Sequence, residues 1–167
     1  YNVSIDYILL DSSPPNVSLN APLSGINTSS QNISFNFTVT DDSTYALNCS
    51  IYLDGIFNVS NSSTSNNTLT NIPISNIAGG SHSWNVTCID IGTNSNTSAT
   101  RNFYVDIFPP SISNVIYYPN ISEFLDPNAN ITVNSTITEA RVNISSVILQ
   151  VHNGTGWSNR TLSLISG

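Results

Sequence analysis

Asparagine has the clearest chemistry in this chain, because most asparagines begin an Asn-x-Ser/Thr triplet, the acceptor for N-linked glycans. Of 25 asparagines, 17 begin such a triplet with x other than proline. The 44 serines and threonines among 167 residues give only about 7 matches by chance. The excess predicts dense N-glycosylation and an exported protein; the alternative is that these are ordinary outward polar residues. The predicted acceptors are Asn2, Asn16, Asn27, Asn32, Asn36, Asn48, Asn58, Asn61, Asn66, Asn85, Asn96, Asn120, Asn130, Asn134, Asn143, Asn153 and Asn159.

The two cysteines, Cys49 and Cys88, are the second candidate for chemistry. In an exported protein, two cysteines predict one disulfide, and neither has a histidine or further cysteine at metal-ligand spacing. Closing this loop would stabilise the fold by about 4 kcal/mol in the chain-entropy model. The alternative is two unpaired buried thiols.

Charge and histidine placement exclude several classes of function. The net charge is −7 with three basic residues, and the scattered Arg101, Arg141 and Arg160 predict no nucleic-acid binding. No run of about eighteen apolar residues is present, so no membrane span is predicted. His82 and His152 lack a nearby nucleophile or metal-ligand partner, and no paired carboxylates mark a catalytic cleft. We therefore expect no enzyme.

Strands must position these groups, because the apolar residues alternate rather than recur at helical spacing. In the run from Ser83 to Asp90, Trp84, Val86 and Cys88 share one face, whereas Asn85 lies on the other. Seven strand candidates lie between residues 14 and 107, with Asp54-Gly55 as a hairpin turn, 60–67 as a loop and 92–96 as a turn. Five acceptors take the parity opposite to the core residues of their strands: Asn32, Asn36, Asn48, Asn58 and Asn85.

A repeat of 95 residues organises the chain, since Pro14-Pro15 and Pro109-Pro110 each follow an apolar strand that ends in aspartate. We expect residues 1–13 to be the last strand of a preceding domain plus a linker, 14–108 a complete domain, and 109–167 the N-terminal part of a second. The partial domain would present two apolar faces and a hairpin tip. Its predicted core residues are Ile131, Val133, Ile137, Val147, Leu149 and Val151, and the predicted tip residue is Trp157.

Five motifs of residues 14–107 resemble the Ig-like repeats of large archaeal and bacterial cell-surface glycoproteins. They are PPNVSLNAP from Pro14, FNFTVTD from Phe35, CSIYLDG from Cys49, GSHSWNVTCIDIG from Gly80 and FYVD from Phe103. The resemblance implies an all-β fold of tandem Ig-like, fibronectin III-like sandwiches. It also implies that the two cysteines lie on neighbouring strands of one sheet, unlike the antibody disulfide between sheets.

Aspartates at strand ends complete the candidate sites. In an Ig-like fold the ends of the second and sixth predicted strands meet at one pole, which brings Asp41 and Asp42 near Asp90, and Asp11 would enter from the preceding domain. Converging carboxylates are ligands that Ca²⁺ prefers. The alternative is that these aspartates cap turns.

These features predict a structural, heavily N-glycosylated repeat unit of an extracellular filament, surface appendage or surface array. We expect its partners to be copies of itself, its location the cell surface, and its cofactors none beyond N-linked glycans and calcium. More of the same protein would complete the partial domains. The alternative is an adhesin stalk or a ligand-binding Ig-like module of a large surface protein.

Overall fold

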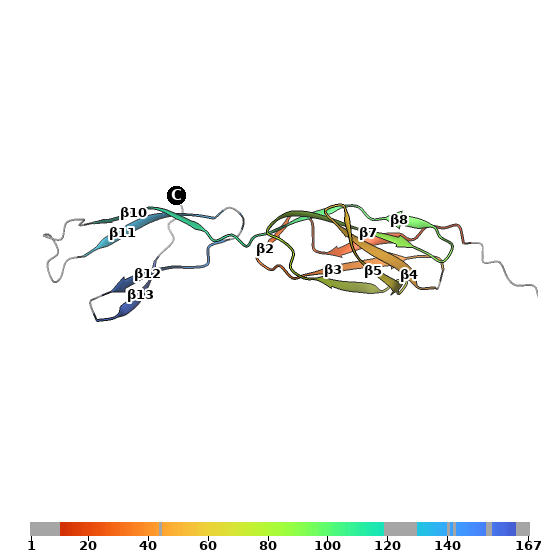
Figure 1. The fold of residues 1–167 in the computed structure, drawn as a ribbon, viewed down its shortest axis with the longest axis horizontal. Helices are drawn as coiled ribbons and strands as arrows, with labels where there is room; N and C mark the ends of the chain where they lie inside the picture. Colours follow the sequence, from red (N-terminus) through yellow and green to blue (C-terminus); the bar gives the residue numbers. More distant parts are fainter. Residues whose placement is uncertain are drawn as a thin grey trace, which may run out of the picture. The chain divides into compact units, whose positions relative to one another are not determined.

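The computed structural model describes residues 11–43, 45–118, 130–139, 141, 143–152 and 155–162. The chain divides into two units, Tyr1–Ile107 (unit 1) and Phe108–Gly167 (unit 2) (Figure 1). Throughout these described ranges the regular structure is strand, with no helix long and apolar enough to span a membrane. Residues 1–10, where the last strand of a preceding domain is predicted, lie outside the described residues.

Unit 1 is a sandwich of two sheets. One has the strand order β1-β3-β6, and the other has the order β2-β9-β7-β4-β5 with β8 beside β7. All neighbouring strands are antiparallel except β2 and β9, which are parallel. The strands described in unit 1 are β1 Asn16–Ala21, β2 Ile26–Thr28, β3 Ile33–Thr40, β4 Leu47–Leu53, β5 Ile56–Thr64, β6 Leu69–Ile74, β7 Gly80–Ile89, β8 Ser95–Thr97 and β9 Arg101–Val105.

Alternating apolar residues on β3, β4, β7 and β9 meet between the two sheets and form the core. Phe35 lies at its centre, with its ring edge-on to Trp84 at 4.9 Å between centroids and to Phe103 at 5.9 Å. All three side chains are 2% exposed or less. The strand alternation read from sequence thus gives an all-β, Ig-like sandwich, and that prediction is confirmed.

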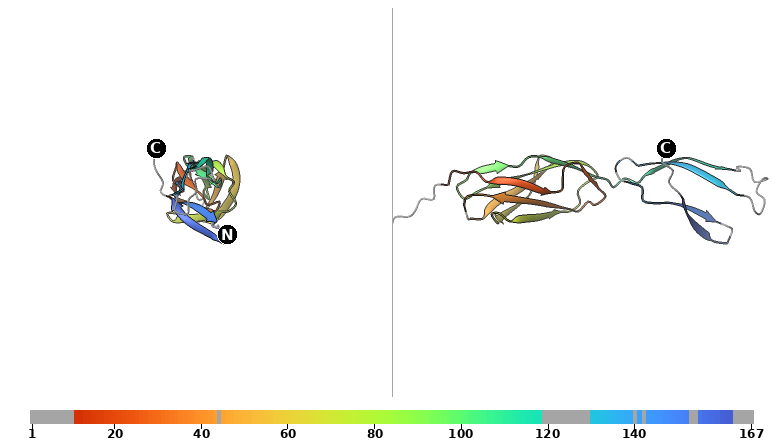
Figure 2. Two further views of the ribbon diagram at one scale, coloured as in Figure 1. Left: turned by 90° about the vertical axis from the view of Figure 1, so that its left-hand side faces the viewer. Right: turned by 180° about the vertical axis from the view of Figure 1, so that it is seen from behind.

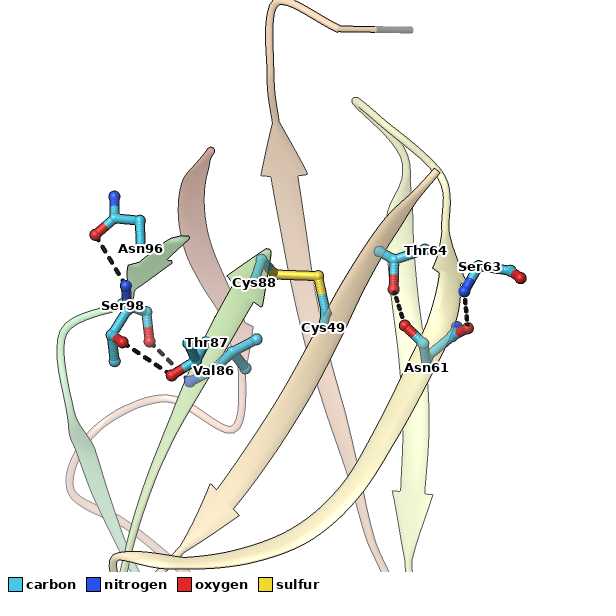
Figure 3. Close-up of a disulfide and its surroundings, with 10 residues drawn as sticks. Cys49, Asn61, Ser63, Thr64, Val86, Thr87, Cys88, Asn96 and Ser98 are labelled. Carbon is cyan, nitrogen blue, oxygen red and sulfur yellow. Dashed lines mark hydrogen bonds between the residues drawn. A yellow bond between two sulfur atoms is a disulfide. The ribbon is translucent and has the colours of Figure 1, made fainter. Parts of the chain in front are cut away.

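A disulfide joins Cys49 on β4 to Cys88 on β7 (Figure 3). The two residues are direct partners across the antiparallel pair, with Cα atoms 4.1 Å apart, and both are fully buried. The bond therefore links neighbouring strands of one sheet rather than the two sheets.

Two predicted connections contain strand residues, and one short strand was not predicted. Residues 60–67 were expected to form a loop, but β5 continues to Thr64, because Leu47 and Cys49 on β4 pair with Thr64 and Asn61. The 92–96 turn was expected to be free of strand, but Ser95 already begins β8 and pairs with β7. The short β2 was not expected. In each case backbone pairing to an adjacent strand holds a polar segment that has no apolar alternation.

Unit 2 contains two separate hairpin-like pairs in its described part (Figures 1 and 2). Strand β10 (Ser111–Tyr118) pairs with β11 (Thr132–Thr138), and β12 (Val147–His152) pairs with β13 (Trp157–Leu162). Both units open with an antiparallel pair of this kind, Asn16 with Thr40 in the β1–β3 pair and Ser111 with Thr138 in the β10–β11 pair, but the two registers differ by three residues when the chain is shifted by 95.

The core predicted for unit 2 is not buried in its described part. Val133, Ile137, Val147 and Leu149 are only half-buried. Two further members of the predicted core, Ile131 and Val151, are exposed. Trp157 was expected at a hairpin tip, but it opens β13 opposite His152, and the two rings lie 4.8 Å apart.

Candidate metal site

Three aspartates from distant parts of unit 1 converge at one pole of the sandwich. Asp41 directly follows β3, Asp90 directly follows β7, and Asp11 lies in the segment that leads into β1. One carboxylate oxygen from each lies within 4.8 Å of those of the other two. We call these three residues the carboxylate cluster. The fourth predicted ligand, Asp42, is exposed and lies outside the cluster.

Each aspartate of the cluster caps its own turn with one oxygen. Asp11 Oδ1 accepts from Ser13 N at 3.2 Å, and Asp41 Oδ1 accepts from Ser43 N at 2.9 Å. Asp90 Oδ1 accepts from Asn94 N at 2.8 Å. The turn-capping role expected for such residues is therefore present at all three positions.

The Oδ2 atoms of the three aspartates differ in whether they accept a hydrogen bond. Asp90 Oδ2 accepts from Asn94 Nδ2 at 3.0 Å. Asp11 Oδ2 and Asp41 Oδ2 are buried, yet neither accepts a hydrogen bond from the described residues. Among those residues, no ion pair neutralises the cluster. Buried carboxylate oxygens without a donor are costly unless a cation or proton compensates them, so the donor set fits a hard divalent cation.

Burial and the neighbouring charges in the cluster change the pKa of Asp41. Burial raises the pKa of its carboxyl above the ordinary value of 3.8, and the backbone N–H of Ser43 partly opposes this. The negative charges of Asp11, Asp42 and Asp90 raise the pKa further. Asp41 therefore carries a charge that its surroundings disfavour unless a positive charge joins it.

Close contacts hold the incoming segment against the pole. Asn94 Nδ2 donates to the carbonyl oxygen of Asp11 at 3.0 Å, as well as to Asp90. A Cβ added at Gly92 would meet that carbonyl oxygen at 2.6 Å and the Asp11 Cβ at 2.9 Å. Glycine at this position thus permits the close approach of Asp11 to the turn after β7.

Asn66 secures the other side of the cluster and was missed as a site residue. Its Oδ1 accepts from Asp41 N at 3.0 Å, and its Nδ2 donates to the carbonyl oxygens of Asp41 and Ser43 at 2.8 and 2.6 Å. We call these three hydrogen bonds the Asn66 clamp. The sequence identifies Asn66 only as a predicted glycan acceptor, and nothing in its Asn-x-Thr triplet predicts the clamp. Asn66 Nδ2 thus donates two hydrogen bonds, which leaves neither of its hydrogens for a glycan.

The predicted acceptors stay out of the core wherever the structure describes them. None of the 14 described acceptors is buried, and 10 are exposed. Asn2, Asn120 and Asn153 lie outside the described residues. The half-buried acceptors are Asn36, Asn61, Asn66 and Asn85, and the exposed ones are Asn16, Asn27, Asn32, Asn48, Asn58, Asn96, Asn130, Asn134, Asn143 and Asn159.

The histidine of unit 1 is held in a structural contact. His82 Nδ1 lies 2.7 Å from Asp54 Oδ2, and its Nε2 lies 2.9 Å from the Ala78 carbonyl oxygen. Asp54 Oδ1 also accepts from Ser83 N at 2.7 Å, and Asp54 has φ +53° in the Asp54-Gly55 turn. This network ties the β4–β5 hairpin to β7, at the opposite end of β4 from Leu47.

Comparison with known proteins gives matches of fold only. No protein-family model matches the chain, and no curated protein matches it. Fibronectin(III)-like modules of CbhA from Clostridium thermocellum match with a TM-score of 0.51 and 13% identity, over 91% of this chain and 80% of that chain. A CARDB domain from Pyrococcus furiosus, solved in complex with di-metal ions, gives a TM-score of 0.40 and 13% identity, over 61% of this chain and 100% of that chain.

Proposed function

We propose that this chain is a structural, heavily N-glycosylated repeat unit of an extracellular filament, surface appendage or surface array. The observation that carries the proposal is the placement of the acceptors, which avoid the core and alternate with core residues along the strands. A glycan can only be accommodated on the solvent side of a sandwich. Glycans would also supply the hydration that a chain with 8% charged residues otherwise lacks.

Copies of the same protein are the partners that fit this function. Unit 2 exposes apolar side chains on β10, including Ile116 at 63% and Tyr118 at 75%. Strand edges and apolar faces of this kind favour pairing with further Ig-like strands. A head-to-tail contact between copies would generate an open filament or array. An adhesin stalk, whose ligand is bound by another domain, is the second candidate.

A calcium ion at the carboxylate cluster belongs to the same proposal. Asp11, Asp41 and Asp90 would hold it, with the two unpartnered oxygens as the principal ligands. The bound ion would supply positive charge where three carboxylates repel one another. Because Asp11 belongs to the segment that enters unit 1, its ligation would fix that segment to the ends of β3 and β7 and stiffen the junction.

Native material tests the structural role directly. Glycopeptide mass spectrometry should find glycans at several of the exposed acceptors, and electron microscopy of native assemblies should show ordered filaments or sheets. Isolated monodisperse rods with glycans would favour the adhesin stalk. Native peptides without any glycan would contradict the proposal.

A further inference from the structure

Two aromatic side chains lie beside a glycan acceptor on the outer face of the larger sheet. Tyr52 on β4 is the direct partner of Asn85 on β7 and of Phe57 on β5. Their neighbours Ile51 and Trp84 point into the core, so Tyr52 and Asn85 point outward by alternation. Directly opposed residues have Cβ atoms about 5 Å apart, so Asn85 lies next to Tyr52, and Phe57 lies one strand further along the sheet.

The aromatic pair offers an exposed apolar surface. The rings of Tyr52 and Phe57 meet edge to face, with centroids 6.1 Å apart and planes at 78°. Phe57 is 55% exposed and Tyr52 is half-buried. A pyranose presents a face of C–H groups that packs on an aromatic ring, since that face is apolar and the ring face is electron-rich.

The hydrogen bonds of Asn85 leave room for modification. Its Nδ2 makes one long contact, 3.4 Å to Thr100 Oγ1. Glycosylation replaces one of the two Nδ2 hydrogens, so this contact can persist. The triplet's hydroxyl residue, Thr87, lies on the same face, where its Oγ1 is 2.8 Å from Thr97 Oγ1. The hydrogen bonds of Asn85 therefore leave one Nδ2 hydrogen for a glycan.

We infer that the first pyranose of a glycan on Asn85 packs on the Tyr52–Phe57 pair, so that this glycan is part of the folded surface rather than a free appendage. The inference rests on the proposed N-glycosylation of the chain and adds a specific sugar-binding contact to it. The ligand class is any pyranose joined at Asn85, because the contact uses its C–H face. The contact would cover the exposed ring of Phe57 and shield the β4–β5 hairpin at the edge of the sheet.

The test uses the full chain, glycosylated by its native source or by a host that modifies Asn85. In nuclear magnetic resonance spectra, the first sugar on Asn85 should show upfield ring-current shifts and contacts to Tyr52 and Phe57 ring protons. The glycan on Asn16 is the matched control, because Asn16 lies opposite Thr40 and no aromatic residue. The Asn85 sugar shifts should return to the control values in Tyr52→Leu.

A stability cycle gives a second measurement. Asn85→Gln should lower the Tm of glycosylated unit 1 by about 4 °C, and by much less in the Tyr52→Leu background. Comparison within each background cancels any packing defect caused by the leucine. One outcome would overturn the inference and leave the proposed function intact. In it, Asn85 carries a glycan, but its sugar shifts equal those of the Asn16 control and Asn85→Gln lowers the Tm equally in both backgrounds. An unmodified Asn85 beside other glycosylated acceptors would overturn the inference alone, whereas unmodified peptides throughout would overturn both.

Discussion

Replacing Asp41 with asparagine should change the stability of unit 1 in opposite directions with and without calcium. Asparagine keeps the oxygen that accepts from Ser43 N but removes the charge. Without calcium, the substitution eliminates two of the three repulsive pairs in the carboxylate cluster, those with Asp11 and Asp90. Oxygens within 4.8 Å repel by about 0.9 kcal/mol per pair in water and by about 3.5 kcal/mol at an effective dielectric constant of about 20.

The lower figure applies here, because Asp41 is only partly buried and solvent screens its charge. Two pairs then give a gain of about 2 kcal/mol, which is about 8 °C in the Tm of a domain of about 100 residues. With calcium at 100-fold above its Kd, the wild-type chain gains about 2.7 kcal/mol by mass action. Asp41→Asn removes a ligand, so most of that gain should be lost.

Thermal unfolding in chelator and in excess calcium measures the change in Tm caused by Asp41→Asn under each condition. The control substitution is Asp42→Asn, at the exposed neighbour of Asp41.

The pH dependence of stability provides a second check. Because the pKa of Asp41 is raised in the folded state, the calcium-free protein should gain stability as the pH falls from neutral through that pKa towards 3.8, and lose it again as the pH rises. In calcium, protons compete with the ion and acid should destabilise. A shift of the same sign in chelator and in calcium would refute the cation site.

Three further outcomes follow from the contacts of unit 1. Asn66 should be unmodified in native glycopeptides, since a glycan would displace a hydrogen bond to the turn after β3; full occupancy there would contradict the clamp. Gly92→Ala should weaken calcium binding in titration calorimetry by displacing Asp11, and an unchanged affinity would remove Asp11 from the ligand set. Thiol titration of the unfolded, unreduced chain should find no free thiol, and replacing Cys49 and Cys88 with alanine should cost about 4 kcal/mol in denaturant unfolding.

Alternation of side chains carried most of what the sequence could predict. It identified the buried faces of β3 and β7 and the outward position of Asn85. The same parity could also have separated Asp41 from Asp42, because Asp41 continues the inward series of Phe35, Phe37 and Val39.

The remainder depends on partners that are distant in sequence. The end of β5 and the short β8 are polar segments whose strand conformation comes from pairing with β4 and β7, and no local pattern encodes that pairing. The clamp made by Asn66 joins residues 25 positions apart. Such contacts become visible only when the sandwich is assembled.

The disulfide between β4 and β7 determines how unit 1 responds to tension along its chain. Cys49 and Cys88 are separated by 39 positions, which correspond to about 130 Å of extended backbone. If a pulling force unfolded the sandwich, the residues between the two cysteines could not extend while the disulfide is intact. Only the segments outside this loop would lengthen. A chain of such units would be less extensible than its residue count suggests, and a reducing agent would release the hidden length.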